Sequence, residues 1–512
     1  MGKKDKKKGK GAAKTAAKTE KKQAMKLKKK LASMGEEDIE RAIMQMEQTE
    51  ANRKKTEEIV VNSPSRRANS SFIPHPTKDA LVLFGGEFYN GSKNTIYGDF
   101  YMYNLNKKEW ATIKAPNHPP PRCGHQMVGT TIDGGQLWMF GGEYLSASSS
   151  QVHHYKELWL YHITNKIWQK INAPNGPSAR SGHRMVLCKK QLIVFGGYYD
   201  NFTNYIYYND VHSFSLEDYT WRPIVPSGVA PAPRSGCCMA ALPDGRILIY
   251  GGYSKEKIKK DVDKGTVHND MFLLTPDKND STGLKWKWVK VKPGGARPLP
   301  RSGLSMAVTV PATKAYTFGG VYDVEESEED LSGTFFNDLH LLDLEQVTWR
   351  TVTLKGAKKV EGETMDEEME ESKPEPAVST VVDDGIFKVT VGPALPQKAA
   401  KTPDPSKQSD EFAPSPRMSS GLAIKNGVLY LYGGLCEVGD KTITLCDFYS
   451  LDLGKLNGWK AIEEDKSQPH EWIDETQIRS QEVMMTAWMM MMMMMMTLMT
   501  HQTQRKKWIL IN

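Results

Sequence analysis

The sequence has few cysteines, and none of the six forms a Cys-x-x-Cys pair. They are Cys123, Cys188, Cys237, Cys238, Cys436 and Cys446. Their spacing to histidine matches no zinc site, and scattered thiols in a long chain are typical of a reducing compartment. No basic stretch followed by an apolar stretch opens the chain, so we expect no secretory signal. The sequence therefore predicts a nuclear or cytoplasmic protein.

Motifs that would indicate catalysis are missing as well. The chain contains no Gly-rich phosphate loop, HExxH, GxSxG or EF-hand pattern. It also lacks the SxDxGxxW boxes that sialidase-like folds carry. We therefore expect no catalytic residue, no resident metal and no cofactor.

A repeat of about 55 residues organises the middle of the chain, and each copy has an apolar run that ends in Gly-Gly. The first four doublets lie 56, 55 and 55 residues apart, and insertions stretch the last two intervals to 68 and 114. Such glycines are expected to serve structure, by adopting positive φ or permitting close backbone approach. The doublets are Gly85, Gly86, Gly141, Gly142, Gly196, Gly197, Gly251, Gly252, Gly319, Gly320, Gly433 and Gly434.

Three other features keep phase with the doublets. A tryptophan follows each doublet, and we expect it to pack between sheets: Trp110, Trp168, Trp221, Trp349 and Trp459 in five of the copies. An acid opens the next alternating run: Asp99, Glu157, Asp210, Asp270, Asp338 and Asp447. An arginine precedes each doublet, in motifs such as PRCGHQMV (121–128) and ARSGHRMV (179–186): Arg67, Arg122, Arg180, Arg234, Arg301 and Arg417.

Each copy thus predicts four short strands, which we call a (after the arginine), b (before Gly-Gly), c (after the acid) and d (at the tryptophan). These features resemble kelch repeats over residues 66–465. The resemblance implies an all-β fold, a six-bladed β-propeller whose sheets stack radially. Because every copy holds its own four strands, we expect no strand exchange between the chain ends.

Antiparallel strands place the a–b and c–d turns on one face of the propeller and the b–c and d–a loops on the other. The b–c loops are long, as in residues 253–269 and the acidic 321–337, whereas a–b turns such as 243–245 are short. Long loops on a rigid scaffold often bind partners, so we predict binding at the b–c/d–a face. The alternative is neutral drift in tolerant loops.

The six arginines lie on that face. The resemblance implies that arginines at such positions can grip acidic peptides, so we predict partner contacts for Arg122, Arg180, Arg234, Arg301 and Arg417. The alternative is that they pair with the acids that open the c strands. His125 and His183, inside a strands, are expected to be buried hydrogen-bonding groups that bind no metal.

The amino-terminal part is basic. Residues 1–30 hold fourteen lysines against Asp5 and Glu20, a net charge of +12 in a chain of +7. We predict a lysine-rich disordered tail over 1–34. Its role is nuclear targeting or non-specific nucleic-acid contact through residues 3–30, and the alternative is a tail that only adds solubility. An amphipathic helix is predicted over 35–58, with Ile39 and Ile43 on one face. We expect this face to dock on the propeller, and docking on a partner is the alternative.

The insert and the carboxyl end depart from the repeat. Residues 356–415 are expected to be mostly disordered, with a small β-hairpin at 379–391 around Asp-Gly. The tail, 466–512, contains eight consecutive methionines at 489–496. A membrane helix there would be short and rich in threonine. Because repeated ATG read one base later encodes aspartate, we expect the tail to be out of frame after about residue 480.

These observations predict a non-enzymatic scaffold or adaptor, a monomer that binds protein partners and no membrane. A substrate receptor of a ubiquitin ligase is a narrower version. A nucleic-acid-associated nuclear factor that uses the lysine-rich tail is an alternative. A third is a propeller oxidase, since some kelch propellers carry copper, although no cluster of tyrosine, histidine and cysteine stands out here.

Overall fold

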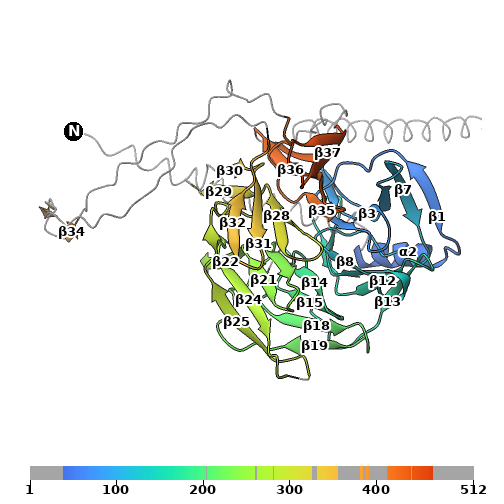
Figure 1. Ribbon diagram of the computed structural model, residues 1–512, viewed down its shortest axis with the longest axis horizontal. Coiled ribbons are helices and arrows are strands. Elements are labelled where there is room, and N and C mark those ends of the chain that lie inside the picture. The colour runs from blue at the N-terminus through green and yellow to red at the C-terminus, as the bar shows by residue number, and fades with distance from the viewer. Residues whose placement is uncertain are drawn as a thin grey trace, which may run out of the picture.

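Six sheets stand around a common axis in the computed structural model (Figure 1). Each sheet is a blade whose a, b, c and d strands follow one another from the axis outward. The predicted all-β six-bladed propeller is thereby confirmed. The structure describes residues 39–464, apart from 203, 260–261, 281, 326–330, 356–380, 384–387, 391–411 and 440.

The strands alternate in direction within each blade. The a strands are β2 (Ser71–Pro74), β8 (Gln126–Thr130), β14 (Arg184–Cys188), β20 (Cys238–Ala241), β27 (Ser305–Val308) and β35 (Gly421–Lys425). The b strands are β3 (Ala80–Phe84), β9 (Gln136–Phe140), β15 (Gln191–Phe195), β21 (Ile247–Tyr250), β28 (Lys314–Phe318) and β36 (Val428–Val438). The c strands are β6 (Phe100–Asn104), β12 (Leu158–His162), β18 (Val211–Ser215), β24 (Met271–Pro276), β31 (Leu339–Asp343) and β37 (Lys441–Asp452). The d strands are β7 (Glu109–Lys114), β13 (Ile167–Ile171), β19 (Trp221–Ile224), β25 (Trp286–Val291), β32 (Thr348–Thr351) and β38 (Lys460–Glu463).

The b–c connections, expected only as long loops, are themselves hairpins. In blade six β36 and β37 simply continue into the hairpin. We call the end of the propeller that carries these hairpins and the d–a connections the crown face. The other five hairpins are β4 (Glu87–Tyr89) with β5 (Asn94–Ile96), β10 (Glu143–Leu145) with β11 (Val152–His154), β16 (Tyr198–Asp200) with β17 (Tyr205–Tyr207), β22 (Tyr253–Lys259) with β23 (Val262–Val267), and β29 (Val321–Glu325) with β30 (Leu331–Phe335).

The core lies between the blades and consists of apolar clusters, each shared by two neighbours. Between blades one and two, Phe84 and Phe100 meet Met127 and Trp168. The sixth and first blades share Phe72, Trp110 and Phe448 in the same way. Since each sheet buries both faces against its neighbours, no blade has a complete core of its own. The repeat tryptophans are buried in these clusters: Trp110, Trp168, Trp221, Trp349 and Trp459.

The ring closes without strand exchange, as the sequence predicts. Each blade is built from its own consecutive strands, and β2 of blade one lies beside β35 of blade six. Backbone hydrogen bonds join the two blades: Gly434 donates to the Arg67 carbonyl at 3.0 Å, and Arg67 donates to the Leu445 carbonyl at 3.1 Å. The last blade therefore contacts the first through its inner strands and the loops above them.

The helix of the amino-terminal extension ends earlier than predicted. The helix α2 spans Ile39–Ala51, and the prediction of helix to residue 58 is wrong, because Glu57–Val61 form a strand, β1. β1 pairs with β7 and becomes a fifth strand at the outer edge of blade one (Figure 1). Its sequence, EEIVV, ends in three β-branched residues that favour an extended backbone, and the open edge of β7 supplies the hydrogen-bonding partner.

β1 occupies a place that other blades fill with the connection from the preceding blade. Ser227 forms such a bridge to Lys287 at the outer strand of blade four, and β26 (Gly294–Gly295) runs along β32 in blade five. Blade one follows no earlier blade in the chain, so it lacks this connection. The amino-terminal extension supplies it instead.

Residues 39–65 form a clasp over three blades. On blade two, Ile43 is buried, Glu47 pairs with Lys170 at 3.1 Å, and Thr56 Oγ1 donates to the Lys166 carbonyl at 2.6 Å. On blade six, the hydroxyl of Tyr432 donates to the Pro64 carbonyl at 2.8 Å. The clasp therefore covers blades two and one and reaches blade six, across the closing junction.

The insert and tails are described only in part. β33 (Val381–Asp383) pairs with β34 (Lys388–Thr390), which confirms the hairpin predicted at 379–391. The predictions for residues 1–34, for 356–380, 384–387 and 391–411 of the insert, and for 466–512 with the methionine run lie outside the described residues. Residues 412–415 are described, and Phe412 packs against Tyr449 with 5.5 Å between ring centroids. Of the helices that the structure describes, none has the length and apolar character to cross a membrane.

The clasp can be tested at its buried side chain. We expect Ile43→Ala to weaken docking of α2 by roughly 2 kcal/mol, because it removes buried methyl groups. Hydrogen exchange of the amides in residues 39–61 should then speed up. Met44→Ala is the matched control, since Met44 is 62% exposed on the same helix, and should change docking by less than about 0.5 kcal/mol. Equal exchange in both variants would contradict the docking described above.

Candidate binding face

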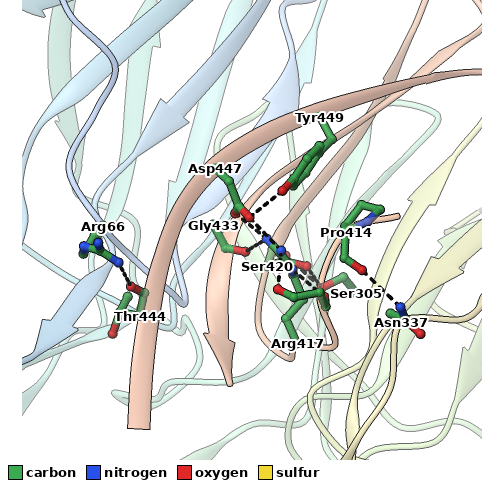
Figure 2. Close-up of polar contacts among 11 residues, drawn as sticks. Arg66, Ser305, Asn337, Pro414, Arg417, Ser420, Gly433, Thr444, Asp447 and Tyr449 are labelled. Atoms are coloured by element: carbon green, nitrogen blue, oxygen red, sulfur yellow. Dashed lines mark hydrogen bonds and ion pairs between the residues drawn. The ribbon is translucent and has the colours of Figure 1, made fainter. Parts of the chain in front are cut away.

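An arginine holds the start of every blade. The six guanidinium groups are buried, with residues no more than 5% exposed. Each donates through Nη1 to the carbonyl of the first glycine in its own blade's doublet, at 3.0–3.1 Å. Each also donates through Nε to the carbonyl two residues earlier. Figure 2 shows this arrangement for Arg417, with Gly433 and Asp447.

The same arginines link neighbouring blades through their backbone. At five of the six junctions the second glycine of a doublet donates to the carbonyl of the next blade's arginine, for example Gly86 to Arg122 at 3.0 Å and Gly142 to Arg180 at 2.9 Å. A Cβ atom on Gly85 would lie 2.4 Å from the Arg122 carbonyl oxygen, and the φ of Gly85 is +65°. Only glycine permits this close approach between blades.

Acids complete the environment of the arginines. Arg417 holds Asp447 with two bonds, 2.5 and 2.8 Å, and Arg180 holds Asp210 at 2.6 and 2.9 Å. Asp270 and Asp338 are held by Arg234 and Arg301 in the same manner. The first two pairs around the ring are longer: Arg67 to Asp99 at 3.4 Å and Arg122 to Glu157 at 3.7 Å.

The sequence left two roles open for the arginines, pairing with the c-strand acids or contact with a partner. This geometry favours the pairing. The side chains of Arg122, Arg180, Arg234, Arg301 and Arg417 are enclosed and already bound to carbonyl groups and acids. A partner could reach them only by displacing those bonds. Direct contact between these arginines and a partner stays a prediction, and their burial argues against it.

The expectation for His125 is wrong in one respect. The ring is buried, as predicted, but neither of its nitrogens has a hydrogen-bond partner among the described residues. Burial first, and the charge of Arg122 second, lower its pKa to about 3, so it stays neutral. It packs edge-on against Phe84 at 5.3 Å and fills the space beside Gly85. Packing, not hydrogen bonding, explains this histidine.

The entrance of the central channel on the crown face is a ring of backbone. The residue two places after each arginine has positive φ, between 53° and 64°. In five of the six blades its amide donates to the carbonyl of the equivalent residue in the preceding blade, as Gly124 does to Asn69 at 3.0 Å and Asn69 to Ser419 at 3.2 Å. We call these residues the mouth ring: Asn69, Gly124, Gly182, Gly236, Gly303 and Ser419. Below it the channel has a volume of about 1420 Å³.

Six side chains, one from each blade, start beside this ring. They belong to the residue that follows each Gly-Gly doublet, where the b–c hairpin begins: Glu87, Glu143, Tyr198, Tyr253, Val321 and Leu435. One side of the mouth is therefore acidic and phenolic, and the other is apolar. The sequence analysis missed these residues, although their fixed place after each doublet could have revealed them.

The two glutamates are poorly solvated. The hydroxyl of Tyr198 donates to Glu143 at 2.7 Å, and Asn69 Nδ2 donates to Glu87 at 2.6 Å. Burial, with smaller contributions from Glu87 and Asp200, raises the pKa of Glu143 to about 7. Burial also raises the pKa of Glu87. Within the part of the chain that the structure describes, neither carboxylate pairs with a lysine or an arginine.

Aromatic rings continue from the mouth onto the hairpins of blades two to four. His154 lies 4.8 Å from Tyr199, Tyr198 lies 5.9 Å from Tyr207, and Tyr207 lies 6.3 Å from Tyr253, between ring centroids. At the end of this surface Phe202 and Ile206 are more than half exposed. No group of three or more His, Cys, Asp or Glu among the described residues is placed to hold a metal.

The arginine pairs generate a stability prediction. We expect Arg417→Met to lower the free energy of unfolding by roughly 3–5 kcal/mol, because Asp447 would be left buried without its cation. Lys190→Met is the control, since Lys190 and Glu217 form an exposed pair, and should cost less than about 1 kcal/mol. Denaturant midpoints measure both changes. An Arg417→Met protein of unchanged stability that loses its partner would instead support direct partner contact.

Glu143 generates a pH prediction. Its pKa is about 7 in the folded chain and near the ordinary 4.5 in the unfolded chain, so the folded state holds the proton more tightly. Stability is therefore lost as pH rises from 4.5 through 7. Relative to the wild type, Glu143→Gln should gain at most about 3 kcal/mol at pH 8 and nothing at pH 4. Unfolding curves at both pH values measure this, and a pH-independent difference would contradict it.

Comparison with known proteins agrees with the fold. A family model described as FBX42, beta-propeller domain, matches residues 67–281. Host cell factor of Drosophila melanogaster is 29% identical over 303 residues, which cover 54% of this chain and 18% of that protein. Kelch domain-containing protein 1 of Homo sapiens is 29% identical over 254 residues, covering 46% and 57% of the two chains.

Two further similarities are weaker or partial. Putative adagio-like protein 2 of Oryza sativa subsp. japonica is 30% identical over 53% of this chain and 41% of its own length. The solved chain titled "Structure of YjhT" aligns with a TM-score of 0.47 and 16% identity over 78% of this chain and 98% of its own. The chain spans no more than 57% of the length of the three relatives named. The chain is therefore similar to kelch-type proteins over about half of its length, and its in-phase repeats and six-bladed fold agree with that similarity.

Proposed function

We propose that the chain is a non-enzymatic interaction protein that binds a protein partner through its crown face. The observation that carries this proposal is the difference between the two faces. The crown face bears a hairpin from every blade, whereas the opposite face bears short turns such as residues 243–245 and 425–427. Ordered hairpins on a rigid propeller can offer a partner a fixed surface.

The exposed side chains support the same face. Phe202 and Ile206 lie on the hairpin of blade three and are 57% and 53% exposed. Aromatic residues are enriched where proteins bind one another, since they bury large area at low entropic cost. Beside them the tyrosines of the hairpins form a continuous surface. The proposed partner contacts this surface, and the buried arginines hold the hairpins that form the surface.

Finer features belong to the same proposal. The lysine-rich amino terminus and the long insert before the sixth repeat resemble kelch domain-containing protein 4. A nuclear or cytoplasmic monomer fits the scattered reduced cysteines. A substrate receptor of a ubiquitin ligase is the narrower form of the proposal, and its partner would be the substrate.

The lysine-rich tail supports a second function, in association with nucleic acid. Fourteen lysines within residues 1–30 can neutralise phosphates without reading sequence, because aromatic residues for base stacking are absent from that segment. In this alternative the tail supplies the affinity for nucleic acid, and the propeller does not contribute to that binding. The relatives' printed names state no enzymatic activity, which agrees with a binding role.

The proposal predicts the effect of two exposed residues. We expect Phe202→Ser with Ile206→Ser to weaken capture of protein partners at least about tenfold, the affinity that roughly 1.4 kcal/mol represents. Thermal stability should not change, because both side chains are exposed. Val310→Ser is the control, since Val310 is 91% exposed on the opposite face. Quantitative affinity capture with nuclease present measures the effect.

Two other results would contradict the proposal. If the variant with Phe202→Ser and Ile206→Ser captures partners as well as Val310→Ser does, the crown face is not the binding surface. Partners that disappear with nuclease, or on deletion of residues 1–34 alone, would assign the function to the lysine-rich tail. Any truncation should keep residues 39–65, because the clasp closes the propeller.

A further inference from the structure

We propose that the mouth of the central channel binds a cationic side chain, a lysine or an arginine, that the protein partner supplies. This inference deepens the proposed function and rests on it, since it names the chemistry that the crown face recognises. The site consists of Glu143, Tyr198 and Tyr253, which line the channel beside the mouth ring, and of Glu87, which accepts a hydrogen bond from Asn69 of that ring.

Charge provides the first support. The charge of Glu87 disfavours ionisation of Glu143, and Asp200 adds a further negative charge nearby. Elsewhere on this face every acid that opens a c strand is paired with a buried arginine. Neither mouth glutamate has such a partner within the described ranges, and a cation brought by another molecule would compensate them.

The nearby histidine does not supply that charge. His154 Nδ1 lies 3.4 Å from Glu143, but burial lowers the pKa of His154, so the ring is neutral near pH 7. Its Nε2 lies 2.8 Å from the Asp200 carbonyl oxygen, and its Nδ1 lies 2.8 Å from the Ser181 hydroxyl. The histidine therefore orders the hairpins of blades two and three and leaves the carboxylate charge uncompensated.

The tyrosines provide the second support. Tyr198 donates its hydroxyl to Glu143, which fixes both side chains at the mouth. Its ring lies beside Tyr207, and Tyr207 lies beside Tyr253, so aromatic rings flank the acids. An ammonium or guanidinium group gains from aromatic faces as well as from carboxylates. The mouth thus offers both kinds of contact that a cation prefers.

The rest of the channel indicates how far the cation enters. On the side of blade six Met418 lines the channel, and its apolar side chain suits an aliphatic stem. Deeper in the channel the charged lining residues are cationic: Arg184 along β14, then Lys314 and Lys425 at the far end. A cation is therefore attracted to the mouth and repelled from the interior.

A peptide selection tests the proposal. A displayed library of random 12-residue peptides is selected against the full chain and against Glu87→Gln/Glu143→Gln, which keeps shape and removes charge. Glu345→Gln, an exposed acid on the opposite face, is the control. Peptides enriched by the wild type should carry a fixed lysine or arginine. Replacing it by glutamine should weaken binding to the wild type about tenfold and to the double variant less than about twofold.

The outcomes separate this inference from the proposed function. Peptides that lack a fixed cation but lose binding to Phe202→Ser/Ile206→Ser would overturn the inference and leave the crown face in use. Peptides that bind all variants alike, or a library without enrichment, would overturn both. Thermal unfolding of each variant shows that the glutamine pair is folded, and a folded double variant that keeps full cation dependence also contradicts the inference.

Discussion

The propeller depends on one arrangement, in which an arginine residue joins two blades. Its guanidinium binds the first glycine of its own doublet, and at five of the six junctions its carbonyl accepts from the second glycine of the preceding doublet. The arginine must be buried for the first contact, so an acid compensates its charge. The glycine must lack a Cβ for the second, since an added atom would reach the carbonyl. Arginine, doublet and acid therefore recur together in the sequence.

The crown face is organised from this arrangement. The position of the arginine determines the position of the residue two places later, which belongs to the mouth ring and hydrogen-bonds to its neighbours there. Fixing the doublet fixes the residue after it, which starts the b–c hairpin and lies at the mouth. Variation is thereby confined to positions that do not carry the blade contacts. Glutamate, tyrosine, valine and leucine all occur at the mouth position, while the arginine and the doublets do not vary between blades.

The sequence predicts the blades well and the binding surface poorly, for a physical reason. Blade contacts repeat six times, so Arg122, Gly141 and Trp168 are recognised by period. The mouth residue is glutamate in two blades, tyrosine in two, and valine or leucine in the other two, so only its position repeats throughout. The strand β1 escapes prediction because it forms once, on an edge created by the absence of an earlier blade. The arginines are buried only when neighbouring blades pack against each other, and the sequence pattern alone does not show that packing.

The clasp has a consequence for how the protein is made. The junction of blades one and six joins residues far apart in the chain; Arg66 donates to the carbonyl of Thr444, 378 positions later. During synthesis, blade one must wait for nearly the whole propeller before its inner strand finds a neighbour. The clasp residues emerge first and can cover the outer edge of β7 and part of blade two during that interval. An amino-terminal extension that looks peripheral in the finished molecule thus shields a nascent sheet from pairing with other chains.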